Sequence, residues 1–401
     1  MLNRRPSTDI LAGMGEAFAV VVVVDGLRAD ALGSYGNAEA ETPFLDRLAA
    51  ESILFDFAYC LDPTLESFYS SAVLGVHPAY RYSGFSSPWR QAGVASLAEA
   101  GSQFLIADNP QIAKIFGEER IWTDTYTIGA AHPQSQERND YGGFFESAAK
   151  WLSERFQGAS DKPCVGWIHT SLQQLGDPFE SRLQYDAVVT TLDEGVRRLF
   201  AELSFPEAGS LVFVVTAARG YALGERGRLG THCPVLHEEL LHIPLIVYTA
   251  EPAFAPARVA RLTSPVDLGT CLSSWLEEHA QSGHPLNASA DYYFWPPESP
   301  GEVSPDCLFF ANSPGDRGFR TPGWYLIQTS SSTAESRVPD DASASHLFLK
   351  PDDRWEFNEV SSLRPEIVEL LASHLDRLTR QSGAGEPLSL PPLPPELLKG
   401  A

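Results

Sequence analysis

The chain has 401 residues, of which 43% are hydrophobic and 20% charged, a composition typical of a globular protein that buries a large core without disulfides or structural metals. Its formal net charge of −23 at pH 7 argues against the basic surface that nucleic-acid binding needs, so we expect no nucleic-acid partner. The five cysteines are far apart and form no CxxC pair, which indicates free thiols in a cytoplasmic protein rather than zinc or redox sites.

The N-terminal segment resembles the start of a signal peptide only in its two arginines, Arg4 and Arg5. A proline and two acidic residues interrupt the segment that follows, and the first apolar run, residues 18–24, is too short to cross a membrane. The sequence therefore predicts no export signal, no membrane-spanning segment and no membrane partner.

Residues 17–24 form a nearly continuous β-branched run, which is typical of a central parallel strand covered on both faces. The run ends at Asp25 and Gly26. Because the loops at the carboxyl ends of parallel strands form the ligand crevice of open α/β sheets, Asp25 is placed where chemistry is usually found.

Strand and helix patterns alternate along the next part of the chain. A helical pattern opens at Thr42 and Pro43, and others cover residues 67–74, 141–156, 185–203 and 236–241. Strand patterns cover residues 53–57, 104–107, 164–169, 211–216 and 243–248. This alternation predicts a doubly wound, mostly parallel central sheet with helices on both faces.

The composition changes from about residue 285, where Pro, Ser and Gly become frequent. Short strand patterns at residues 324–327 and 346–349 precede an amphipathic helix at residues 365–378. We therefore expect an α/β core domain over residues 1–284, a small C-terminal α+β subdomain over residues 285–385, and a Pro-rich tail over residues 386–401 that is extended or disordered.

Several blocks of the sequence have the order and spacing of a known hydrolase family. They are VVVVDGLRADALGSYGN, TPFLDRLAAESILFDFAYC, YDAVVTTLDEGVRRLFAEL, LVFVVTAARGYALGERG, HEELLHIPLIVY, SPVDLGTCLSSWL, GFRTPGWYLI and HLFLKPDDRWEFNEVSS. Together they resemble the sulfatase family of the alkaline phosphatase superfamily over nearly the whole chain. The resemblance implies an alkaline-phosphatase-like fold, and hydrolysis of sulfuric esters as the family activity.

The resemblance also implies a divalent cation, held by two carboxylates at the first strand end and two ligands at a later one. Asp25 keeps the first ligand position, whereas Gly26, Ala218 and Arg219 occupy the others. One carboxylate beside a permanent cation is a poor site for a hard cation that needs several oxygen ligands. We therefore expect no cofactor, with Ca²⁺ or Mg²⁺ required only if the chain is an active hydrolase.

The family nucleophile is a cysteine in a C-x-P-x-R pattern at a helix start, converted to formylglycine. Here Leu65 falls at the cysteine position and Tyr69 at the arginine position, while Cys60 lies too early and has no P-x-R after it. Thr64, in TLES, partly matches the TLPS pattern of some relatives and is a candidate nucleophile. Its alternative role is that of a helix N-cap.

Histidines are the remaining candidates for the site. The family histidine that follows the strand ending at His169 falls at Gly176 here. His232 is the surviving candidate for contact with an anion or a metal, and an imidazole satisfied by local hydrogen bonds accounts for it equally well. His237 and His242 are expected to have structural roles.

Arg219 carries the most specific prediction. Its guanidinium could pair with Asp25 and neutralise a carboxylate that burial would otherwise penalise, or it could contact a bound anion. The alternative is that both side chains face solvent. Arg28 and Asp30 are expected to stabilise the turn after the first strand.

Three functions remain open on the sequence. The favoured one is a pseudoenzyme, a sulfatase-like protein without hydrolytic activity whose cleft or surface binds an anionic small molecule or another protein. The alternative is an active hydrolase of sulfate or phosphate monoesters, with Thr64 as nucleophile and with Asp25, Arg219 and His232 holding the anion. The third is a structural subunit that binds no small ligand.

Overall fold

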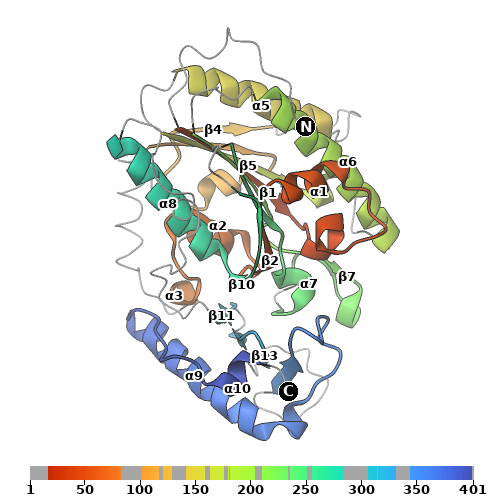
Figure 1. Cartoon of the computed structure of the whole chain (residues 1–401), viewed down its shortest axis with the longest axis vertical. Helices are drawn as coiled ribbons and strands as arrows, with labels where there is room; N and C mark the ends of the chain where they lie inside the picture. Colours follow the sequence, from red (N-terminus) through yellow and green to blue (C-terminus); the bar gives the residue numbers. More distant parts are fainter. Residues whose placement is uncertain are drawn as a thin grey trace.

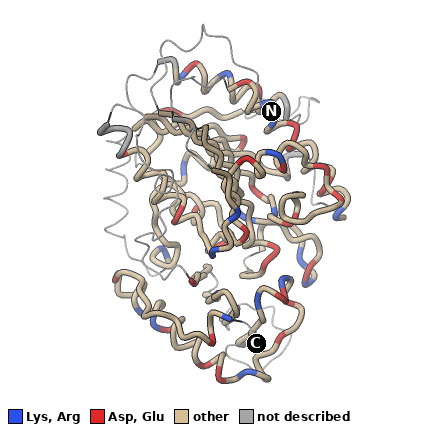
Figure 2. Tube along the Cα trace, viewed as in Figure 1, with Lys and Arg blue, Asp and Glu red and all other residues tan. Residues whose placement is uncertain are grey.

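The computed structural model describes residues 17–82, 101–116, 121–128, 141–158, 163–175, 179, 181–203, 210–233, 235–250, 255–282, 306–313, 315–330 and 344–399. Figure 1 shows two units, an α/β core that holds the large sheet and a smaller C-terminal subdomain below it. Acidic and basic residues are spread along both units rather than separated between them (Figure 2).

An eight-stranded sheet forms the centre of the core, in the order β10-β2-β9-β6-β1-β5-β3-β4. The strands are β1 (Ala17–Asp25), β2 (Ile53–Ala58), β3 (Ser102–Ala107), β4 (Asp124–Thr127), β5 (Cys164–Ser171), β6 (Ser210–Thr216), β9 (Leu245–Thr249) and β10 (Ala257–Thr263). Within this sheet β9 runs antiparallel to both of its neighbours, and the other described pairs are parallel. The expected mostly parallel sheet is therefore present.

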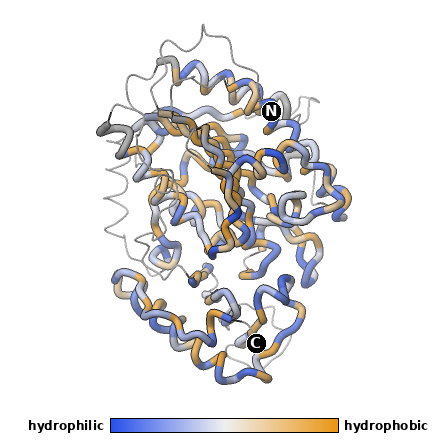
Figure 3. The backbone as a smooth tube through the Cα atoms, viewed as in Figure 1, coloured by the Kyte–Doolittle hydropathy of each residue, from blue (hydrophilic) through white to orange (hydrophobic). Residues whose placement is uncertain are grey.

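β1 lies in the middle of the sheet because its side chains are apolar on both faces. Residues 19–24 are 0% exposed, and Val21 lies opposite Trp167 of β5 and Val214 of β6. Figure 3 shows the central strands as the most hydrophobic part of the molecule. A strand buried on both faces places its last residue, Asp25, at a rigid edge of the sheet.

Helices cover both faces of this sheet (Figure 1). α2 (Leu65–Leu74) and α8 (Pro265–Ser282) lie together on one face, and α1 (Pro43–Ala50), α5 (Tyr141–Gly158) and α6 (Arg182–Glu202) lie on the other. α2 and α8 approach closely because residue 269 is glycine, and a Cβ there would lie 2.5 Å from the carbonyl oxygen of Ser71. In the described part of the chain, no helix is long and apolar enough to cross a membrane.

Short elements connect the larger ones. They are α3 (Ala79–Tyr82), α7 (Glu238–Leu241), the two-stranded β7 (Ala222–Leu223) and β8 (Leu229–Gly230), and the 3-10 helices η1 (Ala29–Ala31), η2 (Gly33–Tyr35), η3 (Ile112–Lys114), η4 (Leu172–Leu175), η5 (Glu225–Gly227) and η6 (Ser361–Leu363). Several of them follow the carboxyl ends of β1 and β6.

The C-terminal subdomain is an antiparallel sheet packed against a helix. The strands are β11 (Leu308–Ala311), β12 (Arg317–Arg320), β13 (Trp324–Gln328) and β14 (Ser345–Leu349), and the helices are α9 (Pro365–Ala384) and α10 (Pro395–Leu398). The expected α+β subdomain is therefore present. The expected domain boundary at residue 284 lies outside the described residues.

Of the two forms expected for the Pro-rich tail, the extended one agrees with the structure, since residues 386–394 have no regular secondary structure and precede the short helix α10. Leu388, Leu393 and Leu397 are buried in the same apolar cluster as the inner face of α9. Leucines spaced between prolines can bury apolar surface without regular structure, which composition alone does not indicate.

Candidate functional site

Asp25 and Arg219 meet at the carboxyl edge of the sheet. Asp25 ends β1, and Arg219 follows β6, the parallel neighbour of β1. The backbone joins the two loops, because the amide of Gly26 donates to the carbonyl oxygen of Arg219 at 3.0 Å. The order of the strands thus brings together residues that are far apart in the sequence.

The predicted pairing of the two side chains is present. Arg219 Nε lies 2.8 Å from Asp25 Oδ1, and Nη2 lies 3.1 Å from Oδ2. Arg219 Nη1 donates to the carbonyl oxygen of Pro63 at 3.0 Å, which ties the pair to the segment before α2. Both residues are buried, with 5% and 6% of Asp25 and Arg219 exposed. Burial works against the charge of Arg219, but attraction and hydrogen bonding to Asp25 leave its pKa raised.

These residues do not fit a divalent cation. Both carboxylate oxygens of Asp25 accept from the guanidinium, while Ala218 is fully buried and offers no oxygen from its side chain. At Gly26, a Cβ would lie 3.4 Å from side-chain carbons of Thr231 and Tyr221. The described residues contain no group of three or more histidine, cysteine or acidic side chains that could hold a metal ion.

Thr64 caps helix α2. Its hydroxyl accepts from the amide of Ser67 at 3.3 Å and lies 2.8 Å from Asp62 Oδ2. The same carboxylate oxygen accepts from the hydroxyl of Tyr82 at 2.5 Å and from that of Ser67. Burial raises the pKa of Asp62. The structural role considered for Thr64 is therefore present, and a carboxylate that could accept its proton lies beside it.

Tyr69 and His169 form a buried pair that sequence reasoning missed. The Tyr69 hydroxyl lies 2.9 Å from His169 Nδ1, and both residues are at most 1% exposed. Burial lowers the pKa of His169 to about 4, so its imidazole is neutral at pH 7. The two residues are 100 positions apart, on α2 and β5, so no local spacing indicates the contact.

The other candidate histidines contact neighbouring groups. His232 is exposed, with Nδ1 3.2 Å from Thr231 Oγ1. His237 Nδ1 lies 2.5 Å from Glu356 Oε2, and His242 Nε2 lies 2.9 Å from the carbonyl oxygen of Asp56. The proposed family position at Gly176 lies outside the described residues.

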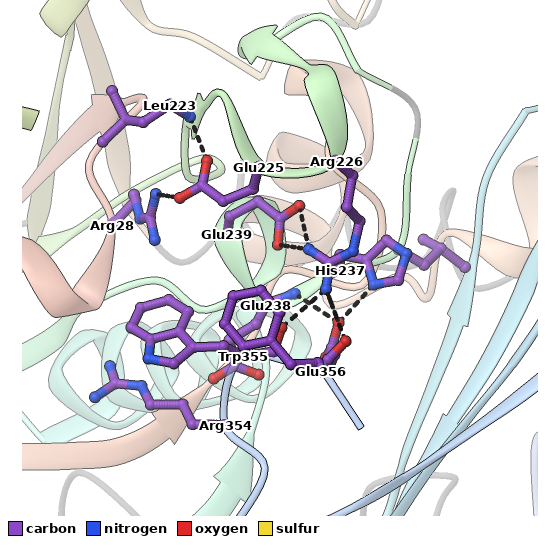
Figure 4. Close-up of polar contacts among 12 residues, drawn as sticks. Arg28, Leu223, Glu225, Arg226, His237, Glu238, Glu239, Arg354, Trp355 and Glu356 are labelled. Atoms are coloured by element: carbon purple, nitrogen blue, oxygen red, sulfur yellow. Dashed lines mark hydrogen bonds and ion pairs between the residues drawn. The ribbon is translucent and has the colours of Figure 1, made fainter. Parts of the chain in front are cut away.

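Arg28 stabilises the loop after β1, as expected. Its guanidinium lies 2.8 Å from Asp30 Oδ1 and 2.6 Å from Glu225 Oε1, and Arg182 Nη1 lies 2.7 Å from Asp30 Oδ2 (Figure 4 shows the contact with Glu225). Burial opposes the charge of Arg28, but these carboxylates leave its pKa raised. The loop is therefore held by internal ion pairs.

Buried charges join the core to the C-terminal subdomain. Lys350, 1% exposed, lies 3.2 Å from Glu238 Oε2 and 3.1 Å from Glu356 Oε1. Arg226 lies 2.8 Å from Glu239 and also donates to the carbonyl oxygen of Trp355 at 2.8 Å (Figure 4). Lys350 is 112 positions from Glu238, and Arg226 is 129 positions from Trp355, so no local pattern could predict these two contacts.

No family model matches the sequence, and no curated protein matches it. Solved structures do match the fold. The phosphonate monoester hydrolase of Agrobacterium radiobacter is 13% identical with a TM-score of 0.63, and the match covers 91% of this chain and 96% of that one. A 2-O glycosaminoglycan sulfatase is 14% identical with a TM-score of 0.66, covering 92% of this chain and 93% of that one.

A third similar structure is a protein solved with its substrate D-glucosamine-2-N,6-O-disulfate. It is 14% identical with a TM-score of 0.65, covering 93% of this chain and 99% of that one. Identities this low relate the chains by fold rather than by activity. The chain therefore has the sulfatase fold, the alkaline-phosphatase-like architecture that the sequence blocks resemble.

Proposed function

We propose that this protein is a catalytically inactive pseudo-sulfatase that acts by binding a small anion or another protein rather than by hydrolysis. One observation carries the proposal: Arg219 forms a bidentate, buried ion pair with the single carboxylate that remains at the metal position. A metal cation that binds Asp25 would have to displace the Arg219 guanidinium. The cation and the displaced guanidinium would then lie close together and repel each other.

The ion pair also explains why the acidic residue is kept without a metal. A buried carboxylate without a partner costs several kcal/mol, whereas a guanidinium that donates to both oxygens removes most of that cost. Arg219 further donates to Pro63, directly before Thr64. The side chain thus occupies the space between the first strand and the start of α2, where a substrate group would have to enter.

The competing candidate is hydrolysis with Thr64 as nucleophile. It is supported by the 2.8 Å contact between Thr64 Oγ1 and Asp62 Oδ2, which has the geometry of a nucleophile and its general base. However, the same Thr64 oxygen caps α2, and the part of the chain that the structure describes has no group of metal-ligating side chains beside it to lower its pKa. These contacts favour the structural role.

Metal content and turnover measured on one purified sample test the proposal. We expect elemental analysis to find no stoichiometric metal. We expect no turnover of aryl sulfate, aryl phosphate or an aryl phosphonate monoester with or without Ca²⁺, Mg²⁺, Mn²⁺ or Zn²⁺. A chelator should leave the thermal unfolding temperature unchanged.

Turnover that is lost in Asp25→Ala but kept in Asp376→Ala would overturn the proposal and favour the hydrolase. Asp376 serves as the control because it is a carboxylate on the exposed side of α9. Loss in both variants would point to a contaminating enzyme instead.

The proposal places the protein in the cytoplasm. All five cysteines are buried, so the fold can use them as small apolar side chains, which suits a reducing compartment. Fractionation of the source cells, with the protein recovered outside the cytoplasmic fraction, would contradict this location.

A further inference from the structure

A polar cavity of about 290 Å³ lies where the core meets the C-terminal subdomain. Its charged lining residues are Asp56, Glu238, Arg258, Arg320, Lys350 and Arg354. Four of these six side chains are cationic, although the whole chain carries a formal charge of −23. The cavity shares no lining residue with the Asp25–Arg219 pair, so it is a separate site.

The two carboxylates of the cavity already have cationic partners. Asp56 Oδ1 accepts from Arg258 Nε at 2.7 Å. Glu238 lies 3.2 Å from Lys350 Nζ and 2.9 Å from His242 Nδ1. Burial opposes the ionisation of Glu238, but Lys350 and His242 hold its pKa below its usual range. Neither carboxylate is therefore available to neutralise a further cation fully.

Arg320 lines the cavity and is 3% exposed. Its Nη1 donates to the carbonyl oxygens of Thr321 and Pro322, and its Nε has no hydrogen-bond partner. Its guanidinium also hydrogen-bonds the Tyr59 side chain, and it interacts electrostatically with Glu238, which already pairs with Lys350. A buried guanidinium is normally matched by a carboxylate or a bound anion, and here that match is incomplete.

Arg354 lines the same cavity from the loop after β14. Its guanidinium lies 5.0 Å above the ring of Trp355, and its Nε is buried without a hydrogen-bond partner. Lys350 Nζ donates to the Arg354 carbonyl oxygen at 2.8 Å, which holds this loop in place. Donors on two separate elements, β12 and this loop, therefore face one space.

We propose that this cavity binds the phosphate or sulfate group of a small molecule, with Arg320 and Arg354 as its main donors. A tetrahedral oxyanion accepts hydrogen bonds from several directions, which suits guanidinium groups on different elements better than a planar carboxylate would. The volume lies near the lower limit of ligand pockets, so the ligand is a small metabolite rather than a polymer. Phosphate and sulfate compounds are therefore the ligand class proposed for the binding function. This proposal does not depend on whether the Asp25 region lacks hydrolytic activity.

Isothermal titration with inorganic phosphate and, separately, with inorganic sulfate at constant ionic strength tests the proposal. We expect one site per chain for at least one anion. Arg354→Gln and Arg320→Gln should each weaken binding by about tenfold or more, because each removes a charge-assisted hydrogen bond. Arg364→Gln is the matched control, since Arg364 is half-exposed in the same subdomain and lies outside the cavity.

An anion affinity that is unchanged in both cavity variants would overturn the proposal. So would a loss of affinity in Arg364→Gln equal to the loss in the cavity variants. Binding of citrate and acetate, but of neither phosphate nor sulfate, would also overturn it. If Arg320→Gln does not fold, Arg354→Gln decides alone, because that side chain is partly exposed. The relative affinity for phosphate and sulfate identifies which group the ligand carries. A negative result here leaves the metal and turnover tests of the pseudo-sulfatase proposal untouched.

Discussion

The Asp25 carboxylate is neutralised by a charge that belongs to the chain itself. A bound cation exchanges with solvent and is removed by a chelator, whereas Arg219 is always present and always protonated. Under the proposed function Arg219 has a structural role, so its effect should appear in stability rather than in rate.

Arg219→Met should destabilise the protein by about 3–5 kcal/mol, because it leaves Asp25 buried without a partner. Chemical denaturation followed by fluorescence measures the change. Arg197→Met is the control, since Arg197 forms an exposed ion pair with Glu194 and should lose less than about 1 kcal/mol.

Adding Asp25→Asn to Arg219→Met should recover much of the lost stability, since the charge is then absent. No recovery in this double variant would mean that Arg219 acts through packing rather than through charge.

His169 should make stability depend on pH. Its pKa is lowered from 6.5 to about 4 by burial, so below pH 6.5 the unfolded chain binds a proton that the folded protein does not. Stability is therefore full above pH 6.5 and decreases as the pH falls toward 4, by about 3 kcal/mol for this residue.

Denaturation curves between pH 7 and pH 4 should show a shallower loss in His169→Gln than in the unmodified chain. His77 gives an internal comparison, because burial also lowers its pKa to about 4, and its loss should flatten the curve similarly. Parallel curves for the chain and for His169→Gln would contradict the assignment of a neutral buried imidazole.

Helix α2 begins at the position that the sequence resemblance assigns to the family nucleophile, and Thr64 caps its first turn. Thr64→Ala should cost about 1 kcal/mol of stability, while Thr64→Ser keeps the hydroxyl and should cost less. Thermal unfolding measures both. Equal losses in the two variants would assign the effect to the methyl group instead of the cap.

The helices and strands could be predicted where burial determines the spacing of apolar residues along the sequence. β1, β5 and β6 were expected because their side chains are apolar on both faces, and the amphipathic α6 and α9 were expected from their periodicity. The strands that were missed include β4 and β10, which form the two edges of the large sheet and carry many polar residues.

At the site, the Asp25–Arg219 pair could be predicted because the resemblance put both residues at ligand positions of one metal site. Tyr69 with His169 and Lys350 with Glu238 could not, since neither contact follows from local spacing.

The two units of the molecule are joined through buried charge as well as apolar contact. Lys350→Met should destabilise the chain by several kcal/mol, because Glu238 and Glu356 then remain buried with fewer partners. Unfolding followed by far-ultraviolet circular dichroism and by tryptophan fluorescence should show one coincident transition in the unmodified chain and two separate ones in the variant. A single transition in the variant would show that apolar contacts alone couple the units.

Gly26 has a backbone φ of +90°, in the left-handed region where a side chain is strained. An aspartate at position 26 would have a strained backbone. An aspartate at position 218 would place a new charge in a fully buried position. Loss of Arg219 alone would leave the buried Asp25 carboxylate without its cationic partner. Each of these single changes toward a metal site therefore gives a less stable protein, so converting this edge of the sheet into a metal site would need several substitutions made together.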